Sequence, residues 1–265
     1  MKAFLMKQVE TGRVPDPLIR MGIRKLLAGR LRQLEDHGES TEQLLARLAD
    51  APVAVDTSAA NAQHYEVPTR FFLKALGPRL KYSSCIWPEG VETLADAEKA
   101  MLDLTCQRAE LANGMDILEL GCGWGSLTLW MAEKFPCSRI LAVSNSATQR
   151  AHIETQALDR GLDNIEVRTC DMNDFDPGRK VDRIVSVEMF EHMRNPGRLL
   201  ERAAGWLNPD GKIFIHIFTH NGKPYLFEDQ GREQDWMSRY FFTGGMMPSP
   251  DYLPKASKSL TLDEE

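Results

Sequence analysis

The spacing of apolar residues changes along the chain and separates a helical first part from an alternating second part. Residues 17–50 place apolar side chains at helical spacing, whereas short apolar runs and helical segments alternate from residue 113 onward. The runs predict five strands, over residues 115–120, 138–144, 164–170, 181–187 and 208–218. Helical patterns cover residues 126–135, 147–158 and about 196–207. This alternation indicates right-handed crossovers and a parallel sheet covered on both faces, so the predicted fold class is α/β.

The same pattern divides the chain into four predicted regions. Residues 1–62 form a helical N-terminal region, 63–112 a helical cap over the substrate and cofactor, 113–220 the nucleotide-binding core, and 221–265 a substrate-side segment and tail. In the cap, Thr93 begins a helix that ends near Leu111, with Asp96 at the capping-box distance. The final dozen residues are predicted to be disordered.

The segment 19–34 predicts an amphipathic and basic helix. Its apolar residues at helical spacing are Ile19, Ile23, Leu26, Leu27, Leu31 and Leu34. Its basic residues are Arg20, Arg24, Lys25, Arg30 and Arg32. Such a helix can lie on a membrane surface. Packing against its own domain, with the basic face in solvent, is the favoured interpretation.

The amino-acid composition bears on which partners the protein binds and on the cellular compartment in which it is expected. The 265 residues are 43% hydrophobic and 26% charged, with a net charge of −6, so nothing points to a nucleic acid partner. The five cysteines are dispersed and form no C-x-x-C pair, which argues against a disulfide framework or a metal site and favours a reducing compartment. No secretory leader or membrane span is visible, and the cytoplasm is the expected location.

The turn ELGCGWG (119–125) follows the first predicted strand, where open α/β sheets bind nucleotides. Gly121 and Gly123 let a ligand approach the backbone closely. The third glycine of the dinucleotide fingerprint is missing, so a pyrophosphate is not favoured. Glu119 stands two residues before the first glycine, where its carboxylate can orient the loop or meet a cationic amino-acid moiety. These features favour S-adenosylmethionine, which carries a sulfonium and no phosphate.

The ends of strands two and three supply the remaining candidate cofactor contacts. SNSATQ (144–149) contains no acidic residue, so neutral groups such as Asn145 and Gln149 are expected to hold the ribose. After strand three, Asp171 and Met172 are expected beside the adenine. Asp171 has an alternative role, which is only to cap a turn.

The stretch VSVEMFEHMRN (185–195) places two carboxylates and an imidazole where strand four ends. Ionisable groups are costly beside buried strands unless they are paired or functional. Glu188, Glu191 and His192 suit proton removal from a methyl acceptor. The alternative for any one of them is a cap on the following helix.

Several motifs together resemble one family, the class I S-adenosylmethionine methyltransferases of the cyclopropane fatty acid synthase group. They are HYEVPTRFF (64–72), LKYSSCIW (80–87), DAEKAMLDLTCQRA (96–109), LELGCGWGSLTLW (118–130), SNSATQ, VSVEMFEHMRN and DWMSRYFFTGGMMPS (235–249). The similarity covers roughly residues 60–250 and is strongest to the coclaurine N-methyltransferase-like branch. It implies a Rossmann-like sheet and S-adenosylmethionine as cofactor. It implies cofactor contacts at Tyr82, Ser83, Gly121, Gly123, Ser144 to Gln149, Asp171 and Met172, and catalytic roles for Glu188, Glu191 and His192.

The resemblance leaves two chemistries, methylation of a small amine and cyclopropanation of a lipid alkene. The synthases are known for a bound bicarbonate base, held by a cysteine, a glutamate and a strand-five histidine, of which Glu191 and His216 match the last two. This chain has Ser84 where the synthases have the thiol, with Cys85 one residue later, and Glu188 where they tend to have glycine. Both departures favour amine methylation, although His216 could equally be a structural strand residue.

A third interpretation concerns the C-terminal part. Members of the resembled family continue past the MMPS stretch and supply two further strands, whereas this sequence ends at LPKASKSLTLDEE. The chain would then be a truncated form that binds cofactor poorly, or a non-catalytic interaction protein. Strand five would be a sheet edge with an apolar row of Ile213, Ile215 and Ile217.

Overall fold

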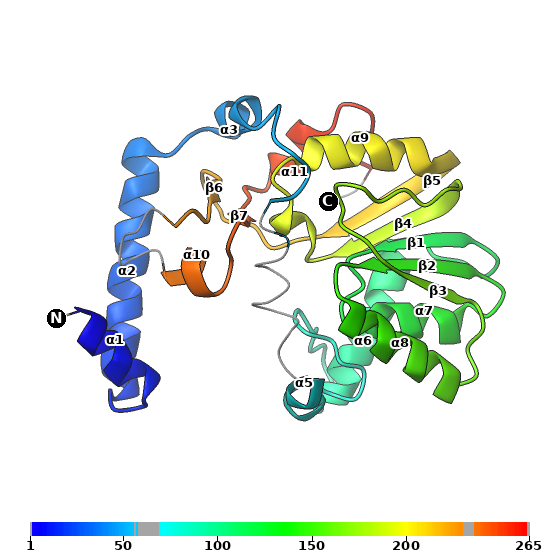
Figure 1. Ribbon diagram of the computed structural model, residues 1–265, viewed down its shortest axis with the longest axis horizontal. Helices are drawn as coiled ribbons and strands as arrows, with labels where there is room; N and C mark the ends of the chain where they lie inside the picture. Colours follow the sequence, from blue (N-terminus) through cyan, green and yellow to red (C-terminus); the bar gives the residue numbers. More distant parts are fainter. Residues whose placement is uncertain (1, 56, 58–68, 230–235, 264–265) are drawn as a thin grey trace.

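The main body of the molecule is built on a five-stranded parallel sheet, on the right in Figure 1. The computed structural model describes residues 2–55, 57, 69–229 and 236–263. The strands are β1 (Asp116–Leu120), β2 (Arg139–Ser144), β3 (Ile165–Thr169), β4 (Val181–Val187) and β5 (Leu207–His216), in the order β3-β2-β1-β4-β5. All five predicted strands are confirmed, and β5 lies at one edge of this sheet within the described part of the chain.

Helices cover both faces of the sheet (Figure 1). One face packs against α6 (Leu94–Arg108), α7 (Ser126–Lys134) and α8 (Ala147–Asp159), and the other against α9 (Pro196–Trp206). The predicted cap of α6 is present, because the Asp96 amide donates to the Thr93 hydroxyl at 3.2 Å. The chain order of strands and helices therefore gives the doubly covered sheet that the sequence predicts.

Alternation along β1 decides which side chains meet which helix layer. Leu118 and Leu120 are fully buried in the cluster that contains the apolar residues of α9. Ile117 faces the opposite layer, with α6 and α7. Glu119 shares that orientation and accepts a hydrogen bond from the Thr128 hydroxyl of α7 at 2.5 Å. The Glu119 carboxylate thus ties the strand to the helix that follows the glycine turn.

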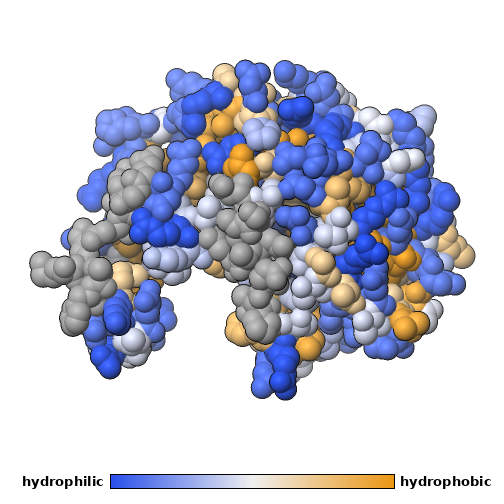
Figure 2. All heavy atoms as spheres, in the orientation of Figure 1, coloured by the Kyte–Doolittle hydropathy of each residue, from blue (hydrophilic) through white to orange (hydrophobic). Residues whose placement is uncertain are grey.

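The N-terminal region differs from the favoured interpretation. It contains α1 (Lys2–Glu10), α2 (Asp16–His37) and α3 (Thr41–Arg47), and α2 stands apart from the sheet (Figure 1). The molecular surface is hollowed between α2 and the main body (Figure 2). Of the apolar stripe on α2 only Leu34 is buried, while Leu26 is 60% exposed and Leu27 is 58% exposed. The expected packing of this stripe against its own domain is therefore wrong for the described residues, because only Leu34, near the C-terminal end of the helix, is buried.

The described residues of the C-terminal region form regular structure of their own. They form a small antiparallel sheet of β6 (Tyr225–Leu226) and β7 (Met246–Met247), followed by α11 (Tyr252–Ala256). The other helices in the part of the chain that the structure describes are α5 (Thr69–Ala75), α10 (Trp236–Tyr240) and the short 3-10 helix η1 (Phe190–His192). Tyr252 is fully buried, and the Lys212 ammonium donates to Asp263 at 2.6 Å. The expectation of disorder is therefore wrong for residues 254–263.

Two sequence expectations fall where the structure gives no description. The predicted boundary between residues 62 and 63 lies outside the described residues, as do positions 64–68 of the HYEVPTRFF motif.

Burial of Glu119 predicts a pH-dependent stability. Burial raises the pKa of Glu119 to about 8, so the folded protein keeps its proton while the unfolded chain loses it near pH 4.5. The free energy of unfolding should therefore fall between about pH 4.5 and pH 8, with the Glu119 contribution on the order of 5 kcal/mol. In Glu119→Gln this part of the fall should disappear in denaturant titrations at pH 5 and pH 8. Glu201→Gln, at an exposed position on α9, should leave it unchanged.

Candidate active site

A cavity opens at the carboxyl ends of β1, β2 and β4. It is lined by Ala54, Val55, Thr57, Gly121, Gly123, Val143, Ser144, Asn145, Gln149, Cys170, Met172, Glu188, Met189, His192, Met193 and Thr243. No lysine or arginine is among these lining residues, and the only carboxylate is that of Glu188. A cavity with this lining suits a cationic ligand better than a phosphate, which would require basic or amide-rich surroundings.

The glycine turn forms one wall of the cavity. Gly121 has φ +80°, and a Cβ there would lie 2.6 Å from Cγ of Met189. Gly123 has φ +52° and would place a Cβ within 4 Å of no other residue, because it borders the open cavity. The amides of Gly121 and Cys122 both donate to the Val143 carbonyl at 3.0 Å, which fixes the turn against β2. The two glycines therefore serve different purposes. Gly121 lets the Met189 side chain pack against the turn, and Gly123 keeps the cavity beside it free of a side chain.

Neutral polar groups from the end of β2 to the start of α8 also line the cavity. The Ser144 hydroxyl donates to Oε1 of Gln149, which is 1% exposed. Nε2 of Gln149 is buried and has no acceptor among the described residues. Asn145 donates to the Thr57 carbonyl at 3.3 Å. A buried donor without an acceptor is rare in a finished fold, so this wall fits a ligand that brings oxygen or nitrogen acceptors, as the adenosine of S-adenosylmethionine does.

Met172 and Asp171 occupy different places after β3. Met172 is buried and lines the cavity. Asp171 accepts the amide and the side-chain Nδ2 of Asn173, both at 2.8 Å. Asn173 in turn exchanges hydrogen bonds of 3.1 Å and 3.0 Å with the backbone of Ala54. Asp171 therefore shapes the turn that brings Ala54 to the cavity and is not itself among the lining residues.

Glu188 projects into the cavity from a left-handed backbone position. Its φ is +51°, and this backbone conformation is energetically unfavourable for residues other than glycine or asparagine. Its amide donates to the His216 carbonyl at 2.7 Å, which extends the pairing of β4 with β5. The hydroxyls of Ser83 and Ser84 donate to the two oxygens of its carboxylate. The position of the carboxylate is thus fixed from both the sheet and the segment before α6.

Glu191 and His192 lie on η1, next to Glu188. Glu191 is 1% exposed, and its Oε1 accepts the Phe218 amide at 2.9 Å, while Oε2 is buried without a partner among the described residues. Burial, aided by the charge of Glu188, raises the pKa of Glu191 to about 7. The His192 ring lines the cavity and stacks on Phe242 with centroids 4.5 Å apart. The pair therefore combines a carboxylic acid that titrates near neutrality with a positioned imidazole.

Burial favours the uncharged forms of two residues considered in connection with bicarbonate binding, His216 and Cys85. Burial lowers the pKa of His216, whose Nδ1 has no hydrogen-bond partner among the described residues. Burial raises the pKa of the Cys85 thiol, with the nearby Lys81 acting in the opposite direction. Lys81 is only 8% exposed, and burial lowers its pKa. Sequence patterns gave no reason to single out this lysine.

The structure brings most of the predicted site residues to one cavity. Those that line it are Gly121, Gly123, Ser144, Asn145, Gln149, Met172, Glu188 and His192. Those that do not line it are Tyr82, Ser83, Asp171 and Glu191. Tyr82 is 49% exposed and packs near the ring of Phe72, whereas Ser83 contacts Glu188. The lining residues that the sequence did not suggest are Ala54, Val55, Thr57, Val143, Cys170, Met189, Met193 and Thr243.

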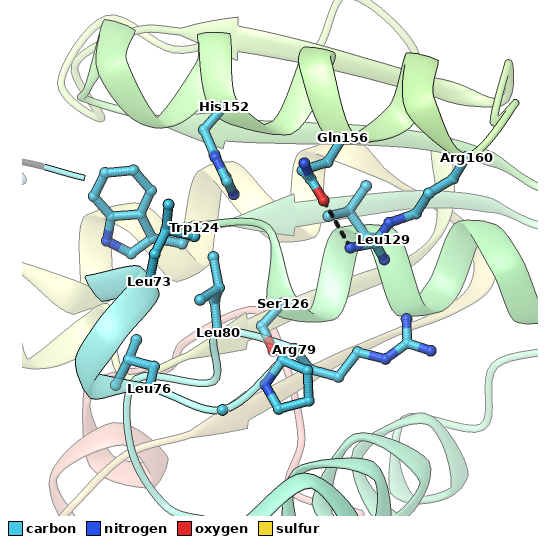
Figure 3. Close-up of a pocket in the computed structure, with 12 residues that line it drawn as sticks. Leu73, Leu76, Arg79, Leu80, Trp124, Ser126, Leu129, His152, Gln156 and Arg160 are labelled. Atoms are coloured by element: carbon cyan, nitrogen blue, oxygen red, sulfur yellow. Dashed lines mark hydrogen bonds between the residues drawn. The ribbon is translucent and has the colours of Figure 1, made fainter. Parts of the chain in front are cut away.

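A second cavity lies between α5, α7 and α8 (Figure 3). Its walls include Leu73, Leu80 and Leu129, with His152 facing it from α8 and Arg160 from the position just after that helix. It contains none of the predicted cofactor or catalytic residues. The cavity at the carboxyl edge of the sheet is therefore the candidate active site.

Comparisons with known proteins find relatives along most of the chain. The family of mycolic acid cyclopropane synthetase matches residues 54–263. (S)-Coclaurine N-methyltransferase from Thalictrum flavum subsp. glaucum is 37% identical over 98% of this chain and 72% of its own length. Cyclopropane-fatty-acyl-phospholipid synthase from Escherichia coli (strain K12) is 30% identical over 88% of this chain and 58% of its own length.

A solved structure that is similar to this chain contains bound ligands. It is coclaurine N-methyltransferase bound to N-methylheliamine and SAH, the demethylated form of S-adenosylmethionine. The TM-score is 0.89 at 34% identity, covering 97% of this chain and 76% of that chain.

A substitution at Gly123 tests whether the glycine turn borders the S-adenosylmethionine site. Gly123→Ala should raise the dissociation constant for S-adenosylmethionine at least tenfold, because its Cβ would enter the cavity. Isothermal titration calorimetry measures this constant. Gly161→Ala is the matched control, since Gly161 has φ +67° and equally open surroundings away from the cavity. It should share the backbone strain and keep the affinity; equal losses in both variants would contradict the assignment.

Proposed function

The chain belongs to the mycolic acid cyclopropane synthetase family of S-adenosylmethionine-dependent methyltransferases, and we propose that, within this family, it methylates the nitrogen of a small-molecule amine. S-Adenosylmethionine is the cofactor. The amine acceptor follows from the (S)-coclaurine N-methyltransferase similarity and from the chemistry of the cavity.

The observation that carries the proposal is the placement of Glu188. A carboxylate at the cavity end of β4, held by Ser83 and Ser84, can stabilise the positive charge that an amine acquires as its nitrogen is methylated. The synthase chemistry needs a bicarbonate site with a thiol. Here Ser84 occupies that position, and its hydroxyl is engaged with Glu188.

The bound cofactor supplies an electrophilic methyl group on a positively charged sulfur. Methyl transfer is an in-line displacement, so the chain contributes mainly alignment and exclusion of water. We assign the glycine turn, Ser144, Asn145 and Gln149 to holding the donor. Met172, Met189 and Met193 supply apolar walls that limit access of water to the reacting atoms.

Proton handling falls to the cluster at the end of β4. Only a neutral amine has a lone pair for attack, so the acceptor must lose its proton before or during transfer. We assign Glu188 to balancing the ammonium charge and His192 to receiving the proton. Glu191 lies behind them, where its ionisation near pH 7 adds a second negative charge to the cluster.

Labelled methyl transfer tests the acceptor class. With deuterated-methyl S-adenosylmethionine, the protein should label a secondary amine such as heliamine, the form of N-methylheliamine that lacks the methyl group. Vesicles of unsaturated phospholipid should remain unlabelled under the same conditions. Mass spectrometry of both acceptors provides the readout, and label confined to phospholipid would refute the amine assignment.

The pKa of Glu191 predicts a pH dependence for the reaction. Since that pKa is raised to about 7, the rate should increase as the pH rises through 7 and the carboxylate forms. Glu191→Gln should lower kcat about 100-fold and remove this increase. The increase of the rate with pH can come from deprotonation of Glu191 or of the acceptor amine, and acceptor amines of different basicity distinguish the two. If the amine is responsible, the pH of the increase changes with the pKa of the amine. If Glu191 is responsible, it stays near pH 7. An unchanged profile in the variant would contradict the role of Glu191.

A second candidate function is modification of a lipid. It is favoured by the similarity to cyclopropane-fatty-acyl-phospholipid synthase and by the exposed apolar and basic residues of α2. No helix in the described part of the chain is long and apolar enough to cross a membrane. The phospholipid arm of the labelling experiment decides between the two functions.

A further inference from the structure

A buried glutamate on α6 lies beneath the segment that carries Ser83 and Ser84. Glu98 is 0% exposed and belongs to the buried face of the helix, together with Ala97, Met101 and Leu102. A carboxylate in such a position must be satisfied by hydrogen-bond donors. Its partners are the backbone amides of Arg79 and Lys81, which donate to Oε2 at 2.9 Å and to Oε1 at 3.0 Å.

The segment bends tightly around this carboxylate. The Leu80 amide donates to the Gly77 carbonyl at 3.0 Å, which closes a turn. A Cβ at Gly77 would lie 2.4 Å from Oε2 of Glu98, so the carboxylate packs directly against the glycine. Each oxygen of the Glu98 carboxylate therefore accepts a hydrogen bond from one backbone amide of the segment. The backbone of the same segment also contacts this carboxylate at Gly77.

Two residues of the segment have unfavourable backbone conformations. Leu80 has φ +52° and Ser84 has φ +59°, in the left-handed region that side chains other than glycine seldom adopt. Such conformations persist only where the surroundings fix them. The Glu98 hydrogen bonds flank Leu80 on both sides. Arg79 adds a second fixation, because its guanidinium pairs with Glu133 at 2.7 Å and lies over the Trp130 ring at 4.7 Å.

The other end of the segment reaches the cavity. Immediately after Lys81 and Tyr82, the hydroxyls of Ser83 and Ser84 donate to the two oxygens of the Glu188 carboxylate. Glu98 and Glu188 are thus joined through five consecutive residues, from Arg79 to Ser83, and through Ser84. A shift of the turn on Glu98 would move both hydroxyls relative to Glu188.

We propose that Glu98 is a positioning residue for the methyl transfer, in which its two amide hydrogen bonds fix the 77–84 segment so that Ser83 and Ser84 aim the Glu188 carboxylate into the cavity. The proposal rests on the proposed function and adds a residue outside the cavity. A carboxylate is required because both amides are donors. A glutamine would offer one acceptor oxygen and present an N–H₂ group to the other amide.

A double-mutant cycle on methyl transfer to heliamine tests the connection. Glu98→Gln should lower kcat 10- to 100-fold while the KM for S-adenosylmethionine changes less than threefold. In the Ser83→Ala/Ser84→Ala background, the same substitution should lower kcat less than threefold further, because the link to Glu188 is already absent. Asp103→Asn, which removes an exposed carboxylate from the same helix, should leave kcat unchanged. Equal effects of Glu98→Gln in both backgrounds would overturn the proposal.

Hydrogen exchange provides a readout that does not need activity. Peptides covering residues 77–85 and 185–192 should exchange faster in Glu98→Gln than in the wild-type protein, whereas peptides from β1 to β3 should be unchanged. If the wild-type protein does not methylate heliamine, the proposed function fails, and this comparison still decides the role of Glu98. Unchanged exchange in residues 77–85 would overturn the proposal, as would loss of a cooperative thermal transition, which would make Glu98 a determinant of the whole fold.

Discussion

Among the described residues, Glu98, Glu119 and Glu191 are buried without a salt bridge to lysine or arginine, and the hydrogen bonds that they accept set the geometry around the cavity. Glu119 receives the Thr128 hydroxyl, Glu98 two backbone amides, and Glu191 the Phe218 amide. Burial of an ionisable carboxylate is costly, and each such hydrogen bond offsets part of that cost while fixing one element against another. The three contacts join β1 to α7, α6 to the segment before it, and η1 to the chain after β5.

The absence of basic side chains from the cavity lining connects this arrangement to the chemistry. A site for a sulfonium donor and an amine that becomes an ammonium must tolerate positive charge on both reactants. Among the described lining residues Glu188 is the one carboxylate, and Glu191 behind it titrates near neutrality. The negative charge available to the reactants thus depends on pH, while Ser144, Asn145 and Gln149, which we propose hold the donor, are neutral. The same cavity would be poorly suited to a phosphate.

Tertiary contacts also define what surrounds the site. The exposed stripe of α2, with Leu27 58% exposed, contrasts with the buried Tyr252 of α11. An amphipathic pattern specifies which side of a helix prefers to be covered, but it does not specify the partner that covers it. Similarly, the aromatic C-terminal segment has no clear periodicity. Tertiary contacts nevertheless position its described residues, because Phe242 packs on His192 and β6 pairs with β7.

The sequence alone determined the five strands, the glycine turn and the cluster of Glu188, Glu191 and His192, because strand periodicity and a turn motif are local properties. It also predicted a cofactor site at the carboxyl edge, since parallel strands bring their carboxyl ends together. Only the tertiary structure decided that the Ser83 hydroxyl donates to Glu188, 105 residues away, that Tyr82 is half exposed, and that Glu98 accepts the Arg79 amide. Those contacts depend on how elements distant in sequence are placed against one another, and residue spacing within one element carries no information about that placement.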